Sequence, residues 1–421
     1  MGEETDQIMK NLELSKWIDK CLIPRELEKK SNAEVSTPFK LRQEMLNKIP
    51  VELWSSTNKV LESCCGKGGF IIDIIGRFMI GLKATIPNEK KRYKTIVEEC
   101  LYFSDINSTN IFICKILIDP YNEYNLNYNE GNTLDLNIKE KWGIDGFDAV
   151  IGNPPYQNSN GGTNGTLWDK FVSQSLKITK TDGYICLVNP SGWRDVNGKF
   201  KKLQRDMFEK NMLYLEIHNE TDGLKIFNCN TRYDWYVIQN NNRYITTKIM
   251  FEDNTIMNIN IRELEFIPNG QYNLVQQLLA KKEDKICQVL HSYSFYETRK
   301  KSMSRDKSEI YKYPCVYTIN SKSEIKHMYS SKNEGHIGIK KLMWSNGSIK
   351  SIASVIDNEG KYGLTQFAYG IVDDEDNLEN IKKAFDSYNF RKLMEFCAVC
   401  KYSVNYKIIG LFKRDFWKDF I

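Results

Sequence analysis

The sequence is poor in the residues that build metal sites and disulfide frameworks. Its 421 residues include only four histidines, and its 11 cysteines are odd in number and irregularly spaced. The close pair Cys397 and Cys400 lacks a second pair at the spacing of a zinc site. We therefore expect reduced thiols, no metal requirement and a cytoplasmic protein.

The sequence also lacks a long apolar run and a large excess of one charge. Residues 70–82 are the most apolar stretch, but they contain Asp73 and Arg77 and are too short to cross a bilayer. Residues 1–28 lack the layout of a signal peptide, so we expect no membrane role. The net charge of +5 permits a nucleic-acid partner without arguing strongly for one.

What the sequence does contain is a regular alternation of short β-rich runs and helical stretches between residues 58 and 240. The expected strands are 59–62, 100–104, 147–151, 183–188, 212–218 and 235–239. The expected helices begin at residue 70 and span 108–118, 167–178 and 199–210. This alternation predicts a doubly wound α/β domain whose ligand lies beyond the carboxyl ends of the strands.

The alternation fades after about residue 240, where a strand over 311–318 and one long helix over 379–400 stand among predicted loops. We expect a helical extension over residues 1–35, an α/β domain over 36–245, and a smaller irregular α+β domain over 246–421.

Two motifs fall where the α/β prediction places a ligand. In the first, Glu62 ends a strand and is followed by Gly66, Gly68 and a helix. Glycines let the backbone approach a ligand, and a carboxylate at a strand end favours a ribose hydroxyl or an amine over phosphate. A plain turn is the alternative.

The second motif is the run Asn153-Pro154-Pro155-Tyr156, which directly follows the strand 147–151. Two prolines fix the backbone and remove two N–H donors. The Asn153 amide and the Pro154 carbonyl then offer two acceptors that match the two hydrogens of an exocyclic amine, and Tyr156 offers a ring for stacking. A tight proline turn capped by asparagine is the alternative.

Together, these motifs resemble those of the S-adenosylmethionine-dependent adenine-N6 DNA methyltransferases, over roughly residues 35–240. The resemblance implies a doubly wound mixed sheet of the class I methyltransferase type, S-adenosyl-L-methionine as cofactor and double-stranded DNA as substrate. It implies catalytic roles for Asn153, Pro154, Pro155 and Tyr156. The implied cofactor contacts are Thr37, Pro38, Glu62, Cys64, Gly66, Gly68, Asp105, Ile106, Asn132, Thr133 and Asn153.

Two positions depart from the family pattern. The acid of the first motif is usually aspartate followed by proline, and here it is Glu62-Ser63. The acid of a later cofactor motif is replaced by Asn132. Both changes keep hydrogen-bonding capacity, so they bear on cofactor affinity more than on cofactor identity.

Basic residues cluster over residues 299–326 and are interleaved with tyrosines. This pattern fits a DNA-facing surface, and a solvated basic face is the alternative. We predict DNA contacts by Trp193, Arg194, Arg299, Lys300, Lys301 and Arg305. The polar stretch 158–165 is a candidate loop near the entering nucleotide, with an uninvolved surface loop as the alternative.

The predicted function is methyl transfer to the N6 amine of a flipped-out adenine in DNA, sequence-specific and of restriction–modification type. No nuclease motif is convincing, so a cognate restriction endonuclease would be encoded separately. The alternatives are the same chemistry on RNA adenine, on cytosine N4 or on protein glutamine, and a non-catalytic DNA-binding subunit that kept the fold. The C-terminal position of the extra domain favours DNA, and Asn153 disfavours cytosine, since serine is more frequent there in cytosine-N4 enzymes.

Overall fold

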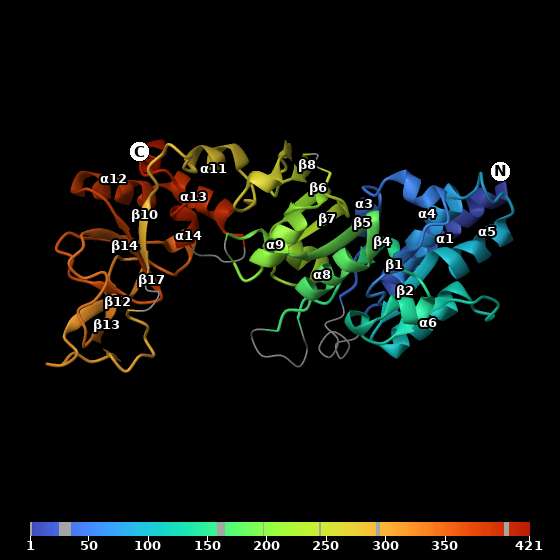
Figure 1. The fold of residues 1–421 in the computed structure, drawn as a ribbon, viewed down its shortest axis with the longest axis horizontal. Helices are drawn as coiled ribbons and strands as arrows, with labels where there is room; N and C mark the ends of the chain where they lie inside the picture. Colours follow the sequence, from blue (N-terminus) through green and yellow to red (C-terminus); the bar gives the residue numbers. More distant parts are fainter. Residues whose placement is uncertain are drawn as a thin grey trace. The chain divides into compact units, whose positions relative to one another are not determined.

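The computed structural model describes residues 2–24, 35–157, 165–196, 198–243, 246–291, 295–399 and 404–421. The chain divides into two compact units (Figure 1). Unit 1 comprises Met1–Trp193 and Gly198–Leu264, and unit 2 comprises Arg194–Asn197 and Glu265–Ile421. Among the described residues, no helix is long and apolar enough to span a membrane.

Unit 1 is built on a nine-stranded sheet with the order β3-β2-β1-β4-β5-β7-β6-β8-β9. The strands are β1 (Val60–Glu62), β2 (Leu101–Asp105), β3 (Asn127–Glu130), β4 (Phe147–Gly152), β5 (Thr179–Pro190), β6 (Asn211–His218), β7 (Tyr233–Gln239), β8 (Thr247–Met250) and β9 (Ile256–Ile259). Neighbouring strands from β3 to β5 pair in parallel, whereas β7 is antiparallel to both β5 and β6. The predicted mixed, doubly wound sheet is confirmed.

Helices cover both faces of this sheet, which buries adjacent strand residues on opposite sides. Val60 of β1 joins the core under helix α4, and Leu61 joins the opposite core around Phe147. The helices are α1 (Gly2–Cys21), α3 (Phe39–Leu46), α4 (Gly69–Gly81), α5 (Glu89–Thr95), α6 (Ser108–Ile118), α7 (Ile138–Trp142), α8 (Trp168–Ile178), α9 (Lys201–Phe208) and α10 (Glu220–Phe227). Helix α1 packs against α4 (Figure 1).

The strand order reverses at β1, which pairs with β2 on one side and with β4 on the other. Glu62 at the end of β1 lies opposite Ile151, so the carboxyl ends of β1 and β4 open beside each other. A doubly wound sheet binds its ligand at such a reversal point.

Unit 2 contains two four-stranded sheets, with the orders β10-β17-β14-β15 and β11-β13-β12-β16. The strands are β10 (Gln288–His291), β11 (Met303–Ser304), β12 (Tyr313–Ile319), β13 (Ile325–Ser330), β14 (Lys341–Ser345), β15 (Ser354–Asp357), β16 (Gly363–Leu364) and β17 (Ala368–Val372). Its helices are α11 (Tyr272–Leu278), α12 (Glu375–Asp386), α13 (Tyr388–Cys397) and α14 (Tyr406–Ile409). The α+β character is as predicted.

Two details of the prediction for this unit are wrong. The single helix over 379–400 is two helices, because Ser387 adopts an extended conformation and caps α13 by accepting a hydrogen bond from the Phe390 N–H. Much of the predicted loop is β-sheet. Strand β14 is buried along its whole length, so its sequence lacks the apolar–polar alternation that reveals a half-exposed strand.

A buried ion pair holds the interior of unit 2. The Lys341 ammonium lies 2.8 Å from the Asp357 carboxylate, and both side chains are almost fully enclosed. The ammonium also donates to the backbone carbonyls of His336 and Ile339. Asp357 accepts from the N–H groups of residues 361 and 362, so this carboxylate joins β15 to the following turn.

We expect unit 2 to lose stability in mild acid because of His336. Burial lowers the pKa of this imidazole from 6.5 to about 4. Its Nδ1 accepts the Leu364 N–H, and its Nε2 lies 3.1 Å from the His291 carbonyl, an arrangement that suits the neutral ring. Between pH 6.5 and 4 the unfolded chain therefore binds more protons than the folded one, so stability falls as pH falls.

Thermal denaturation of the full chain, followed between pH 7 and 4, measures this effect. The His336→Gln variant should show a shallower decline of the unit 2 transition than the wild type. Equal slopes in the two proteins would rule out His336 as the source.

Candidate functional site

The loop between β1 and α4 has a backbone that requires glycine. Gly66 and Gly68 have φ angles of 49° and 89°, in the left-handed region that disfavours other residues. A Cβ on Gly68 would also lie 3.3 Å from the Cys114 sulfur. The loop therefore turns tightly over the sheet edge and leaves its backbone open to a ligand.

Two carboxylates stand at the ends of the neighbouring strands. Asp105 of β2 accepts hydrogen bonds from the Gly66 N–H at 2.9 Å and the Asn107 N–H at 2.8 Å. Burial, together with the charge of Asp105, holds the pKa of Glu62 well above its usual range. Glu62 Oε1 accepts from the Cys64 N–H, and Oε2 has no hydrogen-bond partner among the described residues. Burial also raises the pKa of Asp105, so both carboxyl groups at this sheet edge are harder to ionise than exposed ones.

The Asn-Pro-Pro-Tyr run begins directly after β4 and opens onto the same edge. A Cβ on Gly152 would lie 2.7 Å from Glu62 Oε1, so only glycine permits this close approach of the two strand ends. The Asn153 Nδ2 donates weakly to the Val35 carbonyl at 3.4 Å. The Asn153 Oδ1 is buried and accepts no hydrogen bond from the part of the chain that is described. This oxygen can therefore accept a hydrogen bond from a ligand.

A cavity of about 270 Å³ joins these elements. Of the predicted site residues, its wall includes Thr37, Cys64, Gly66, Asp105, Ile106, Asn132, Thr133, Asn153 and Pro155. Pro38, Glu62, Gly68, Pro154 and Tyr156 are neighbours in sequence but do not form the wall. The structure therefore brings together most of the residues that the motifs selected.

The wall also contains residues that the sequence did not reveal. Ile18 and Asp19 come from α1, Arg42 from α3, and Lys67 and Asn110 from the α4 and α6 region. Lys67 lies within the glycine motif but had no predicted role, and the other four belong to no recognisable motif. Only the packing of α1 and α3 over the loop places Ile18, Asp19 and Arg42 there. The one available signal was the polarity of Asp19 and Arg42 within segments that otherwise bury apolar residues.

Tyr156 belongs to an aromatic group beside the cavity. Its ring meets Phe227 edge-on at 6.4 Å, and Phe227 meets Tyr233 at 4.9 Å. The phenol oxygen is buried without a hydrogen-bond partner among the described residues, and burial raises the pKa of Tyr156. The side chain is therefore a neutral aromatic surface.

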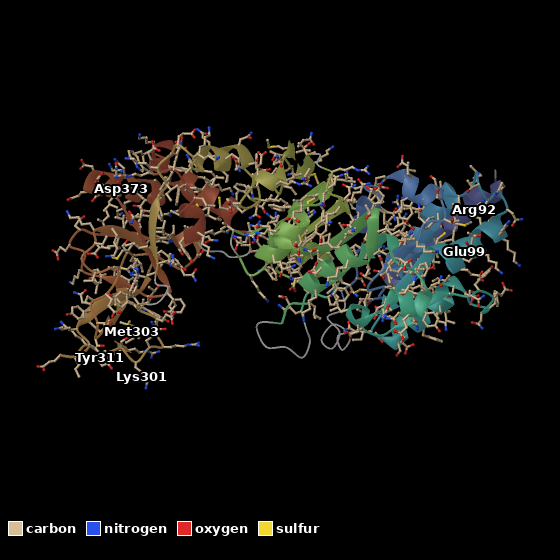
Figure 2. The ribbon with its side chains drawn as sticks, viewed as in Figure 1. Arg92, Glu99, Lys301, Met303, Tyr311 and Asp373 are labelled. Carbon is tan, nitrogen blue, oxygen red and sulfur yellow. The ribbon has the colours of Figure 1, made fainter. Side chains whose placement is uncertain are left out.

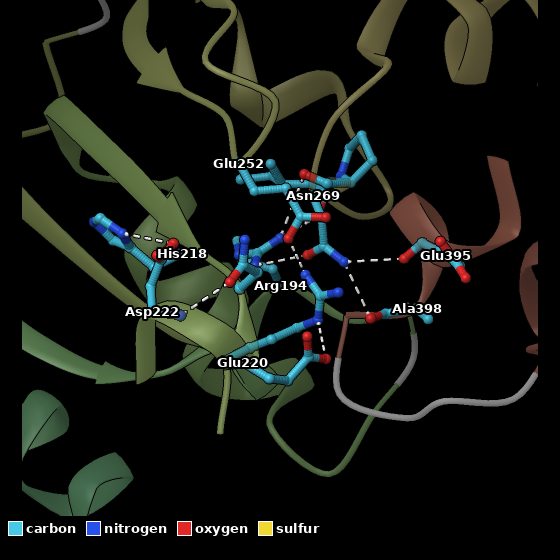
Figure 3. A network of polar contacts seen from close by, with 12 residues as sticks. Arg194, His218, Glu220, Asp222, Glu252, Asn269, Glu395 and Ala398 are labelled. Atoms are coloured by element: carbon cyan, nitrogen blue, oxygen red, sulfur yellow. Dashed lines mark hydrogen bonds and ion pairs between the residues drawn. The ribbon is translucent and has the colours of Figure 1, made fainter. Parts of the chain in front are cut away.

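Charged side chains adjoin this aromatic group through His218, which Figure 3 shows with Glu220 and Asp222. His218 stacks on Tyr233 at 4.4 Å and lies 3.1 Å from the Glu216 carboxylate. Burial lowers the pKa of His218, but Glu216 and Asp222 outweigh it and raise the pKa above its usual value. Arg232 pairs with Glu220 and Glu252, which ties α10 to the start of β7.

The predicted DNA-binding residues divide into two groups. Trp193 is fully buried and packs edge-on against Phe208 and Tyr236. Arg194 is also fully buried, and within unit 2 it donates to the Ile267 carbonyl and to Asn269 Oδ1 (Figure 3). The DNA-contact prediction for these two residues is wrong, because neither side chain is accessible.

The other predicted DNA contacts lie on the surface of unit 2. Arg299, Lys301 and Arg305 are exposed, and Lys300 is partly buried. The Tyr311 hydroxyl donates to the Lys301 carbonyl at 3.0 Å, so the basic segment is held next to β12 (Figure 2). The predicted polar loop 158–165 lies outside the described residues, apart from Gly165.

Comparisons with known proteins show similarity to restriction–modification methylases. Residues 99–227 match the family model of the Eco57I restriction–modification methylases. A curated "uncharacterized adenine-specific methylase" of Mycoplasma pneumoniae is 25% identical over 303 residues, covering 54% of this chain and 70% of that protein.

Two solved structures are similar over most of the chain. A DrdV–DNA complex aligns with a TM-score of 0.50 at 10% identity, over 90% of this chain and 56% of that one. The Type ISP restriction–modification enzyme LlaGI, bound to a DNA substrate mimic, aligns with a TM-score of 0.50 at 13% identity, over 89% and 46%. This chain spans about half the length of these structures, and the likeness shows the fold. The sheet order is that of a class I methyltransferase, and the chain is similar to the adenine-specific methylases of restriction–modification systems, as its motifs predicted.

Proposed function

We propose that this protein transfers the methyl group of S-adenosyl-L-methionine to the N6 amine of an adenine in double-stranded DNA. The observation that carries the proposal is the buried Asn153 Oδ1, an acceptor with no partner among the described residues, on the wall of the cavity at the strand reversal. An unsatisfied buried acceptor is costly unless a ligand supplies the missing donor.

The cavity suits the proposed cofactor. Asp105 is held by two backbone N–H groups at a position suited to ribose hydroxyls, and Ile106 and Leu134 provide apolar wall for an adenine ring. Glu62, Cys64 and the glycine loop complete the end of β1. When bound, S-adenosylmethionine supplies an electrophilic methyl group, and the residues of this chain bind and orient the reactants.

Adenine N6 is a poor nucleophile because its lone pair is delocalised into the ring. Two acceptors in the Asn-Pro-Pro-Tyr run would make it more nucleophilic. Hydrogen bonds from the amine to Asn153 Oδ1 and to the Pro154 carbonyl would favour a pyramidal nitrogen with its lone pair directed at the methyl group. The contribution is positioning and electrostatics, without a strong base. An adenine reaches this depth only after leaving the duplex, and the Tyr156 ring beside Phe227 supports stacking of the extruded base.

We further propose that unit 1, which contains the expected catalytic domain over residues 36–245 and also strands β8 and β9, carries out catalysis, and that unit 2 selects the DNA target. The exposed basic side chains of unit 2 support this division, since phosphate contacts by lysine and arginine position a protein on DNA. A cognate endonuclease encoded separately completes the proposed restriction–modification system.

Removing two of these charges should weaken DNA binding. We expect the double variant Lys301→Ala/Arg305→Ala to bind duplex DNA about tenfold more weakly and to show a smaller dependence on salt, because a protein that neutralises fewer phosphates releases fewer counterions. Fluorescence anisotropy over a salt series measures both effects. Lys383→Ala, an exposed lysine of α12, is the control, and equal affinities in the two variants would refute a DNA-facing role.

The proposed function is tested with tritiated S-adenosylmethionine and mixed-sequence duplex DNA, followed by nucleoside analysis. N6-methyladenine is the expected product. N4-methylcytosine as the product, or label found only in RNA or in glutamine peptides, would show that the methyl acceptor is not adenine N6 of DNA. Absence of cofactor binding at millimolar concentration would instead support a non-catalytic DNA-binding subunit.

A further inference from the structure

The N-terminal helix α1 contributes a carboxylate to the wall of the cavity. Asp19 is 25% exposed, whereas Ser15 and Ile18 on the same helix are buried against the rest of unit 1. Asp19 Oδ1 lies 2.6 Å from Arg42 Nη1, and Oδ2 accepts the Phe39 N–H. A carboxylate can accept about four hydrogen bonds, so Asp19 keeps acceptor capacity for a ligand.

Arg42 fixes the position of this carboxylate but has no donor left for a ligand. Its Nε donates to Asp73, its Nη1 to Asp19 and the Thr37 carbonyl, and its Nη2 to the hydroxyl and carbonyl of Ser15. These contacts use all five N–H groups of a guanidinium. A Cβ on Gly69 would lie 2.7 Å from the guanidinium carbon, so the glycine loop packs directly against Arg42.

The order of groups along the cofactor decides what Asp19 faces. The proposed function places the ribose at Asp105 and the methyl group near Asn153. The Asn153 amide bonds the Val35 carbonyl, and the segment from Val35 leads to Thr37 and hence to Arg42 and Asp19. The part of the cofactor that continues beyond the sulfur is its amino acid, which carries an ammonium group.

We propose that Asp19 binds the α-ammonium group of the cofactor's methionine moiety, with Arg42 as the positioning residue, so that α1 is part of the cofactor site. This inference rests on the proposed function. It assigns α1 a role in recognition in addition to packing. A charge-assisted hydrogen bond from an ammonium to a partly buried carboxylate is among the stronger polar contacts in proteins.

The test compares two ligands on the full chain by titration calorimetry. One is S-adenosylhomocysteine, and the other is the analogue that lacks only the α-ammonium group. Asp19→Asn should weaken S-adenosylhomocysteine about tenfold to hundredfold and leave the deamino analogue within about twofold. Glu13→Gln, an exposed carboxylate on the same helix, is the matched control and should change neither affinity.

An equal loss of both ligands in Asp19→Asn would overturn the inference and leave α1 a packing role only. If thermal melting shows that Asp19→Asn does not fold, Asp19→Glu serves as the second variant. We expect it to bind S-adenosylhomocysteine at least fivefold more weakly and the deamino analogue with unchanged affinity. Equal changes in the two affinities would overturn the inference. If the wild type binds neither ligand, both the proposed function and this inference fail. Binding by the wild type without discrimination in the variants refutes the inference alone.

Discussion

Replacing Asn153 with alanine should lower the rate of methyl transfer by about a thousandfold while cofactor affinity changes only a few fold. The substitution removes the Oδ1 acceptor that would hold the amine, and loss of one such preorganised hydrogen-bonding group typically costs a hundredfold to a thousandfold in rate. Among the described residues, the side chain bonds only the Val35 carbonyl, and weakly, so the fold should survive. Single-turnover label transfer and calorimetry with S-adenosylhomocysteine separate the two effects.

Asn258→Ala is a matched control, because this asparagine is exposed on the edge strand β9 of the same unit. It should retain the wild-type rate. An Asn153→Ala protein that still transfers label within tenfold of the wild type would show that the amine is activated elsewhere in the site.

The largest expected effect on stability is that of Lys341→Met in unit 2. The substitution leaves Asp357 buried opposite an apolar side chain, and breaking a buried pair from one side costs about 3–5 kcal/mol. We expect the free energy of unfolding of unit 2 to fall by that amount. Guanidinium denaturation followed by tryptophan fluorescence reports on it, because Trp344 lies on the same strand.

The double variant Lys341→Met/Asp357→Leu distinguishes the broken ion pair from altered packing. Removing both charges eliminates the unpaired carboxylate, so the double variant should recover part of the stability, although the N–H groups of residues 361 and 362 lose their acceptor. A double variant less stable than Lys341→Met would indicate that Asp357 acts mainly through those two backbone bonds.

The parts of the fold that the sequence predicted are those specified by local patterns. Helix α6 was placed at its observed bounds, and the glycine loop and the Asn-Pro-Pro-Tyr run were placed at strand ends that the structure brings together. Strand β3 was not predicted because Asn127 and Asn129 are polar and only half-buried. Its place in the sheet depends on pairing with β2 instead of on apolar alternation.

The candidate site was predictable only in part for a similar reason. Asp19 and Arg42 reach the cavity from separate helices, through contacts that span 23 residues of sequence between them and 31 between Arg42 and Asp73. No spacing rule links such positions. The DNA-contact prediction for Arg194 was wrong for the same reason, because its guanidinium donates to residues more than 70 positions away in sequence.

The passage of the chain from unit 1 into unit 2 at residues 194–197, and back again, has a consequence for synthesis on the ribosome. Arg194 finds its partners Ile267 and Asn269 only after the nascent chain has grown about 70 residues further. Val196 likewise belongs to the core of unit 2. A protein ended at residue 264 would contain all nine strands of the unit 1 sheet, yet it would lack these partners of a buried guanidinium. A fragment designed to contain unit 1 alone should therefore also have Arg194 removed or replaced. A fragment that simply ends at residue 264 should be prone to aggregation.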